Sequence, residues 1–187
     1  MALVALVKHS LPLVDPTVRA SRWRLGSEGI ARCGSLAAKL RRFAPASVVT
    51  STEPKAAETS ALIAAALGVP YTGAEGLHEH ERDLWLEPER FEAAIRSVFE
   101  RPQERVFGDE SGATARARFG GALDRVLQAA PEQNLAVVTH GTVLSLYVAA
   151  VAGLDGFALW RRLGLPSFVV LERPTLELLA VVESVLE

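Results

Sequence analysis

The sequence predicts an α/β protein, because short apolar runs that read as buried strands alternate with segments of helical periodicity. The apolar runs lie at residues 2–7, 46–50 and 135–139, and two further strands are expected near 167–172 and 177–183. Between them, apolar residues recur at helical spacing. This alternation is typical of a sheet with helices packed on its faces.

The predicted helices have start and stop signals of their own. In chain order, they are expected after Ser27, after Pro54, after Pro88, before Pro131 and over residues 141–151. Serine suits a helix N-terminus, and proline suits the first helical turn but not the interior. We therefore expect five helices between and beside the strands.

Length and composition favour one domain over residues 1–187, since this is little more than one average domain length. Apolar residues make up 49% of the chain, which suffices for a core without disulfides or a structural metal. Twenty basic against 22 acidic residues give a net charge of −2, which argues against nucleic acid or a membrane surface as a partner. The single cysteine, Cys33, indicates a reducing compartment, and we expect the cytoplasm. No sequence feature defines an oligomeric state.

One apolar stretch is long enough to span a bilayer by count alone. Residues 135–154 contain no Asp, Glu, Lys or Arg. Polar residues in its middle, among them His140 and Ser145, favour a buried strand that passes into a buried helix. We therefore expect no membrane span here.

Polar residues follow the three clearest strands at the point where each ends. They are Lys8-His9-Ser10, Ser51-Thr52-Glu53-Pro54-Lys55 and Thr139-His140-Gly141. Ligands of open α/β sheets bind at the carboxyl ends of the strands, and neighbouring parallel strands would bring the two histidines together. Helix N-termini after Glu53 and at Gly141, with Lys8 and Lys55, would attract an anion, and phosphate fits best.

These residues resemble the histidine phosphatase superfamily, also called phosphoglycerate mutase-like proteins. Six segments carry the resemblance in the family's order: Leu6–Ser10, Leu25–Gly29, Ser51–Thr59, Leu77–Glu79, Gly108–Ser111 and Val138–Gly141. The resemblance implies a three-layer α/β/α sandwich with a mostly parallel central sheet. It also implies a phosphomonoester phosphatase without cofactor or metal, acting on a small phosphorylated metabolite.

The resemblance also implies roles for individual residues. His9 would attack phosphorus and form a phosphohistidine, and His140 would contact the transferring phosphoryl group. Glu79 would protonate the leaving oxygen, for which it needs a raised pKa, and Glu81 is the alternative acid. Phosphate or substrate contacts are expected from Lys8, Ser10, Ser51, Lys55, Glu81, Arg82 and Gly141. Substrate selection is expected from a loop around residues 71–90.

Three positions depart from the family pattern. Lys8 and Lys55 stand where the family has arginine, and Ser10 stands where it has glycine. Two of the chain's three lysines occupy these positions, although arginine is far more abundant in this sequence. Lysine keeps the charge but lacks the planar fork that binds two phosphate oxygens at once. A phosphoryl mutase and a weakly active or non-catalytic phospho-ligand binding protein therefore remain as alternatives.

Other polar and aromatic residues have simpler interpretations. His78 and His80, with Glu79, Glu81 or Asp83 nearby, allow a zinc or manganese site as a less favoured alternative. Arginines of the fourth helix, Arg116 and Arg118, are expected to be solvated. The tryptophans are expected in the core or in a pocket wall, with Trp85 placed to line the leaving-group side: Trp23, Trp85 and Trp160.

Overall fold

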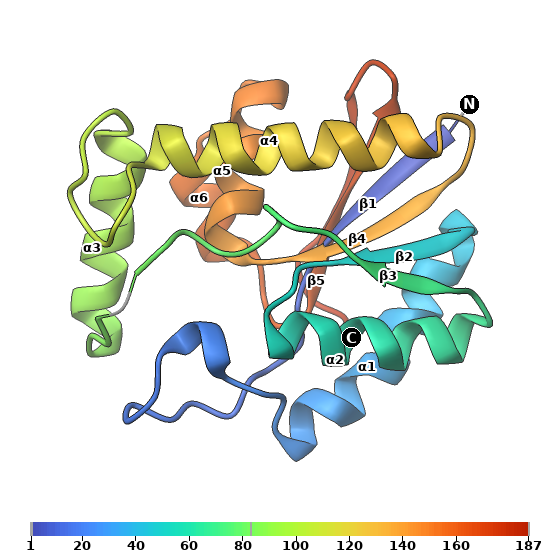
Figure 1. Cartoon of the computed structure of the whole chain (residues 1–187), viewed down its shortest axis with the longest axis horizontal. Helices are drawn as coiled ribbons and strands as arrows, with labels where there is room; N and C mark the ends of the chain where they lie inside the picture. The colour runs from blue at the N-terminus through green and yellow to red at the C-terminus, as the bar shows by residue number, and fades with distance from the viewer. Residues whose placement is uncertain (1, 83, 187) are drawn as a thin grey trace.

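The computed structural model describes residues 2–82 and 84–186, and its centre is a six-stranded sheet (Figure 1). The strand order is β3-β2-β4-β1-β5-β6. The first four strands in this order are parallel to one another. At the other edge, β5 runs antiparallel to β1, and β6 runs antiparallel to β5. The bounds are β1 (Ala2–Lys8), β2 (Ser47–Thr50), β3 (Tyr71–Gly73), β4 (Leu135–Thr139), β5 (Ser167–Arg173) and β6 (Leu178–Val182).

Helices cover both faces of this sheet, so the predicted three-layer α/β/α class is confirmed (Figure 1). One face carries α1 (Ser27–Leu40) and α2 (Pro54–Leu67). The other carries α3 (Pro88–Glu100), α4 (Gly112–Ala129), α5 (Gly141–Ala152) and α6 (Gly156–Arg162). Two short 3₁₀ turns complete the helical elements, η1 (Ala20–Arg22) and η2 (Arg41–Phe43).

Successive side chains of the central strands point to opposite faces of the sheet, and this produces a hydrophobic core on each side. In β1, Val4 and Leu6 face the α3 to α6 layer, whereas Ala5 and Val7 face α1 and α2. The strands β4 and β5 alternate in the same way between the two cores. Burial on both faces explains why these strands appear in the sequence as continuous apolar runs.

The apolar stretch 135–154 forms β4 and then α5, as predicted. Residues 135–148 are all buried within the protein. Across residues 2–82 and 84–186, no helix is both long and apolar enough to cross a membrane.

Two elements differ from the sequence-based expectation. The expected loop at 71–88 begins with the short edge strand β3, whose three residues are exposed and give no apolar alternation. The seven-residue helix α6 was not predicted, because it is too short to show a helical period. Asp155 caps it by accepting a hydrogen bond from the Ala158 N–H (2.9 Å).

Candidate active site

Two histidines meet where adjacent strands end. Lys8 of β1 lies opposite Thr139 of β4, so His9 and His140 leave the sheet side by side. The His9 N–H donates to the Thr139 carbonyl (3.0 Å), and the two imidazole centroids are 5.1 Å apart. Both rings are almost wholly buried, with His9 6% exposed and His140 not at all. The structure therefore brings together the two histidines that the sequence placed at strand ends.

Hydrogen bonds fix the orientation of both rings. His9 Nδ1 lies 2.7 Å from the Ser10 carbonyl oxygen, which can only accept, so Nδ1 carries the proton and Nε2 keeps its lone pair. Burial first, and then the neighbouring His140 and Lys55, lower the pKa of His9 well below its ordinary value. His140 Nε2 lies 2.8 Å from the hydroxyl oxygen of Ser51, which follows β2. His9 is therefore a neutral imidazole whose Nε2 is available as a nucleophile at neutral pH.

Both predicted lysines line the same pocket, and both already have acceptors. Lys8 Nζ donates to the Leu163 carbonyl (2.6 Å), and burial lowers the pKa of Lys8 to about 8, against the opposing effect of Glu79. Lys55 Nζ donates to the Ala20 carbonyl (2.7 Å) and to the carboxylate of Glu53. An incoming phosphate therefore has to share these cations with protein oxygens.

Glu79 occupies the helix N-terminus that the sequence assigned to phosphate. Its carboxylate accepts from the N–H groups of Thr142 (3.1 Å) and Val143 (3.2 Å), in the first turn of α5, and from the His80 N–H (2.8 Å). Arg82 lies 3.5 Å away on the other side. Glu79 thus engages the Thr142 and Val143 N–H groups at the end of α5 where the sequence predicts an anion, whereas Gly141 lines the pocket. Gly141 itself lies under the Lys8 side chain, where an added Cβ would be 3.0 Å from Lys8 Cε.

The same contacts decide the charge of Glu79 in the free protein. Burial raises its pKa, but Arg82, then His140 and the backbone N–H donors, outweigh this effect and hold the pKa well below its usual range. Glu79 is therefore an ionised carboxylate in the free protein and lacks the raised pKa that an acid needs.

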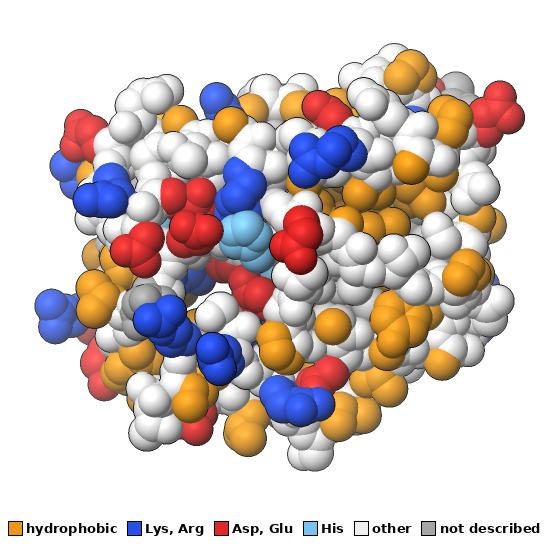
Figure 2. Space-filling model, in the orientation of Figure 1, with side chains coloured by type: hydrophobic (Ala, Val, Ile, Leu, Met, Phe, Trp, Pro, Cys, Tyr) orange, Lys and Arg blue, Asp and Glu red, His pale blue; other side chains and the backbone are white. Residues whose placement is uncertain are grey.

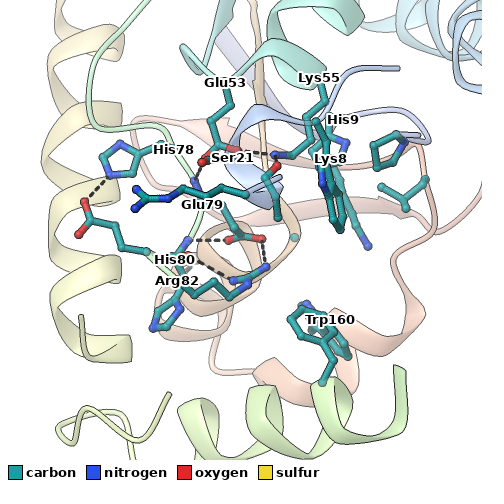
Figure 3. Close-up of a pocket in the computed structure, with 18 of the residues that line it drawn as sticks. Lys8, His9, Ser21, Glu53, Lys55, His78, Glu79, His80, Arg82 and Trp160 are labelled. Atoms are coloured by element: carbon teal, nitrogen blue, oxygen red, sulfur yellow. Dashed lines mark hydrogen bonds and ion pairs between the residues drawn. The ribbon is translucent and has the colours of Figure 1, made fainter. Parts of the chain in front are cut away.

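Glu53 is a second carboxylate in this site that sequence reasoning did not select. Its Oε1 accepts from the Glu79 N–H (3.0 Å) and lies 3.8 Å from His140 Nε2, while Oε2 pairs with Lys55 (Figure 3). The residue is 9% exposed. Glu53 therefore neutralises one predicted phosphate-binding cation and also holds the backbone of the predicted acid.

Two predicted contact residues point elsewhere. The Ser10 hydroxyl donates to the Gly29 carbonyl of α1 (2.7 Å), and Ser10 does not line the pocket, so the structure gives no support to its expected contact with phosphate. Glu81 lies at the pocket rim, where its half-exposed carboxylate pairs with His78 Nε2 (3.1 Å). Arg82 points into the pocket between Glu79 and the ring of Phe91. Asp83 lies outside the residues that the structure describes.

An arginine of α4 clamps the segment that carries Glu79. Arg118 was expected to be solvated, yet its side chain is only 19% exposed and pairs with Glu110 at 2.5 Å. Glu110 in turn accepts from the Glu81 N–H (3.0 Å). The Arg118 guanidinium also donates to three backbone carbonyls, those of Gly76, His78 and Glu79 (2.9, 2.9 and 3.0 Å). Three backbone carbonyls of the four-residue segment 76–79 are thereby held by one side chain.

The histidines of the metal alternative engage different partners. His78 Nε2 contacts the Glu81 carboxylate, whereas His80 Nε2 lies 3.0 Å from the backbone carbonyl oxygen of Glu110. No cluster of three metal-ligating side chains occurs among the residues described. The structure thus offers no support for the zinc or manganese alternative.

The site opens into a cavity of about 760 Å³. Figure 2 shows the hollow on this face, with acidic, basic and histidine side chains gathered around it. The predicted phosphate contacts Lys8, Lys55 and Arg82 line the cavity. Two of the three tryptophans, Trp23 and Trp160, line it as well. Trp85, expected on the leaving-group side, is 40% exposed and does not line the cavity.

An α/β sheet whose adjacent strands end in two buried histidines, with lysines beside them, defines an anion-binding protein suited to phosphoryl chemistry. Residues 18–175 match the family model of the histidine phosphatase superfamily (branch 1), and the chain belongs to this family. The match starts after Lys8, His9 and Ser10.

Solved structures share the fold over nearly the whole chain. YhfR of Bacillus stearothermophilus superimposes with a TM-score of 0.79 at 19% identity, with 100% of both chains covered. Phosphoserine phosphatase of Entamoeba histolytica, in complex with 3-phosphoglyceric acid, gives 0.78 at 15% identity, covering 98% of each chain. Mycobacterial glucosyl-3-phosphoglycerate phosphatase with inorganic phosphate gives 0.76 at 19% identity, also covering 98% of each. No curated protein sequence shows significant similarity to this chain.

Proposed function

We propose that this protein is a phosphomonoester phosphatase that acts through a phosphohistidine at His9 on a small phosphorylated metabolite. The observation that carries the proposal is the pair of buried rings, His9 and His140, whose centroids are 5.1 Å apart. His9 lines the cavity together with Lys8 and Lys55, whereas His140 contacts the His9 ring without lining the cavity itself. Membership of a phosphatase family supports it, as do neighbours in fold that are phosphatases. The cavity leaves room for a leaving group beyond the phosphoryl position.

In the first step, His9 Nε2 forms a bond to phosphorus while the bond from phosphorus to the leaving oxygen breaks. The His9 proton stays on Nδ1, held by the Ser10 carbonyl. Lys8, Lys55, Arg82 and His140 stabilise the charge on the three equatorial oxygens. Positioning and electrostatics thus supply most of the catalysis.

Glu79 supplies the leaving oxygen with a proton. In the free protein, Glu79 is ionised. A bound phosphate dianion competes for Arg82 and adds negative charge beside the Glu79 carboxyl, which raises the pKa of that carboxyl. The protonated Glu79 donates as the leaving group departs. The resulting carboxylate then takes a proton from the water that attacks the phosphohistidine, which releases phosphate and restores His9.

Turnover separates this proposal from its alternatives. The purified protein should hydrolyse a generic aryl phosphate in the presence of EDTA, be inhibited by vanadate, and lose activity in His9→Ala with an unchanged circular dichroism spectrum. Brief exposure to labelled substrate should leave acid-labile phosphate on the parent protein but not on His9→Ala. A protein that transfers phosphate between two positions of its substrate without releasing it would be a mutase.

A non-catalytic phospho-ligand binding protein is the second candidate, and one observation favours it. Glu53 neutralises Lys55, an expected phosphate-binding residue, and Glu79, the expected acid, is ionised in the free protein, so neither group starts in the state that its expected role requires. Such a protein would bind phosphate with no detectable hydrolysis and no labelled His9.

A further inference from the structure

The cavity beyond the phosphoryl position has an aromatic wall, formed by Phe91 of α3 and Trp160 of α6. Their rings are 6.0 Å apart and both line the cavity. Each is supported from behind by another ring: Trp160 stacks on Phe157 (5.8 Å, 16°), and Phe91 makes an edge contact with Phe107 (6.2 Å). The aromatic wall therefore presents fixed rings rather than mobile side chains.

This wall adjoins the phosphoryl end of the cavity on two sides. Lys8 Nζ donates to the carbonyl of Leu163, one turn after Trp160 in the chain. The Arg82 guanidinium lies 3.5 Å from the Glu79 carboxylate and also 5.0 Å over the Phe91 ring. Figure 3 shows the Arg82 guanidinium between the Glu79 carboxylate and the Trp160 ring. A group that leaves from phosphorus toward Glu79 would therefore reach the wall.

The cavity is much larger than a phosphoryl group. Its volume of about 760 Å³ falls in the range of pockets that hold drug-sized ligands, about 300–1,000 Å³. Further apolar surface comes from Pro12, Trp23 and Leu165, which line the same cavity. The space next to the aromatic wall therefore suits a leaving group of ring size, with little need for charge on it.

We propose that this cavity selects phosphomonoesters whose leaving group carries a planar aromatic ring, which stacks on Trp160 and Phe91. This inference rests on the proposed function and names its substrate class. Flat rings gain from offset or edge contacts with tryptophan and phenylalanine beyond the area they bury. The Arg82 guanidinium, which lies over the Phe91 ring, places a planar cation at the edge of this wall, where it can also contact such a ring.

Binding of phosphonates tests the inference without requiring turnover. Titration calorimetry of the unmodified protein would compare methylphosphonate, benzylphosphonate and cyclohexylmethylphosphonate, which share the anionic end. We expect benzylphosphonate to bind at least about tenfold more tightly than methylphosphonate and several-fold more tightly than the cyclohexylmethyl compound. Equal affinities for the two ring compounds would mean recognition of apolar bulk alone and would overturn the aromatic proposal.

Variants of two tryptophans provide the matched comparison. Trp160→Leu should abolish the preference for benzylphosphonate while leaving the affinity for methylphosphonate unchanged, whereas Trp85→Leu, outside the cavity, should preserve the preference. If Trp160→Leu does not fold, Phe91→Leu tests the same wall from α3. A preference that survives both substitutions would overturn the proposal. If all three phosphonates bind equally, only the aromatic proposal falls, whereas failure of all three to bind overturns the proposed phosphoryl site as well.

Discussion

Replacing Glu53 with glutamine should strengthen the binding of phosphate. In the free protein, Glu53 pairs with Lys55, and its other oxygen lies 3.8 Å from His140 Nε2. A phosphoryl group seated against His140 therefore meets this carboxylate at short range. Glutamine keeps an oxygen that can accept from the Glu79 N–H, so the backbone of the acid should stay in place while the charge is lost.

Two effects set the size of the gain. Two unit charges about 5 Å apart repel by about 3 kcal/mol at an effective dielectric constant of about 20, and solvent in the open cavity reduces this. Release of Lys55 also allows a charge-assisted hydrogen bond to phosphate, of about 1.5–3 kcal/mol. A net gain of about 2 kcal/mol after these offsets corresponds to a Kd about 30-fold lower.

Calorimetric titration with inorganic phosphate at pH 7 measures this gain directly. Glu58→Gln is the matched control, because Glu58 lies on α2, the helix that follows Glu53, and pairs with a basic residue, Arg24, but does not line the cavity. Thermal unfolding of both variants checks that the fold is retained. Phosphate affinity that is unchanged or weaker in Glu53→Gln would refute the argument that Glu53 competes with the ligand for Lys55.

Three further predictions concern the acid, its clamp and the first lysine. Glu79→Gln should lower kcat strongly for alkyl phosphates but much less for aryl phosphates, whose leaving groups need no proton; equal losses would move the acid role elsewhere. Arg118→Gln should reproduce this leaving-group dependence in weaker form, by misplacing Glu79, while Arg116→Gln on the same helix should not. Phosphate affinity should fall as pH rises above about 8, because Lys8 then loses its charge, and Lys8→Arg should remove this fall. A pH-independent Kd in the parent between pH 8 and 10 would show that Lys8 does not bind the anion.

The central part of the site was predictable because neighbouring parallel strands end at the same edge of the sheet and so bring the residues that follow them together. His9, Ser51 and His140 each follow a buried apolar run, and the order β2-β4-β1 places the ends of these runs at one edge. The five longer helices were likewise predictable from apolar spacing and capping residues. These features depend on local sequence and on the general geometry of sheets.

The rest depends on contacts between residues that are distant in the chain. Glu53 was visible within its motif, but its partner at the Glu79 N–H lies 26 positions away, and no local pattern reveals that contact. Arg118 looked like an ordinary helix-surface charge because its acceptors lie 39 to 42 positions earlier. The low pKa of Glu79 follows first from Arg82, which is near in the chain, and then from His140 and the Thr142 N–H, which lie more than sixty positions later.

The double anchoring of Glu79 has a consequence for how this protein can change. The carboxylate is bound to the first turn of α5, the helix that starts beside His140, and its backbone is bound to Arg118 of α4. Residues 84–87, which follow in the chain before α3, take no part in either anchor. Selection or engineering can therefore rewrite that stretch while the reacting groups keep their spacing.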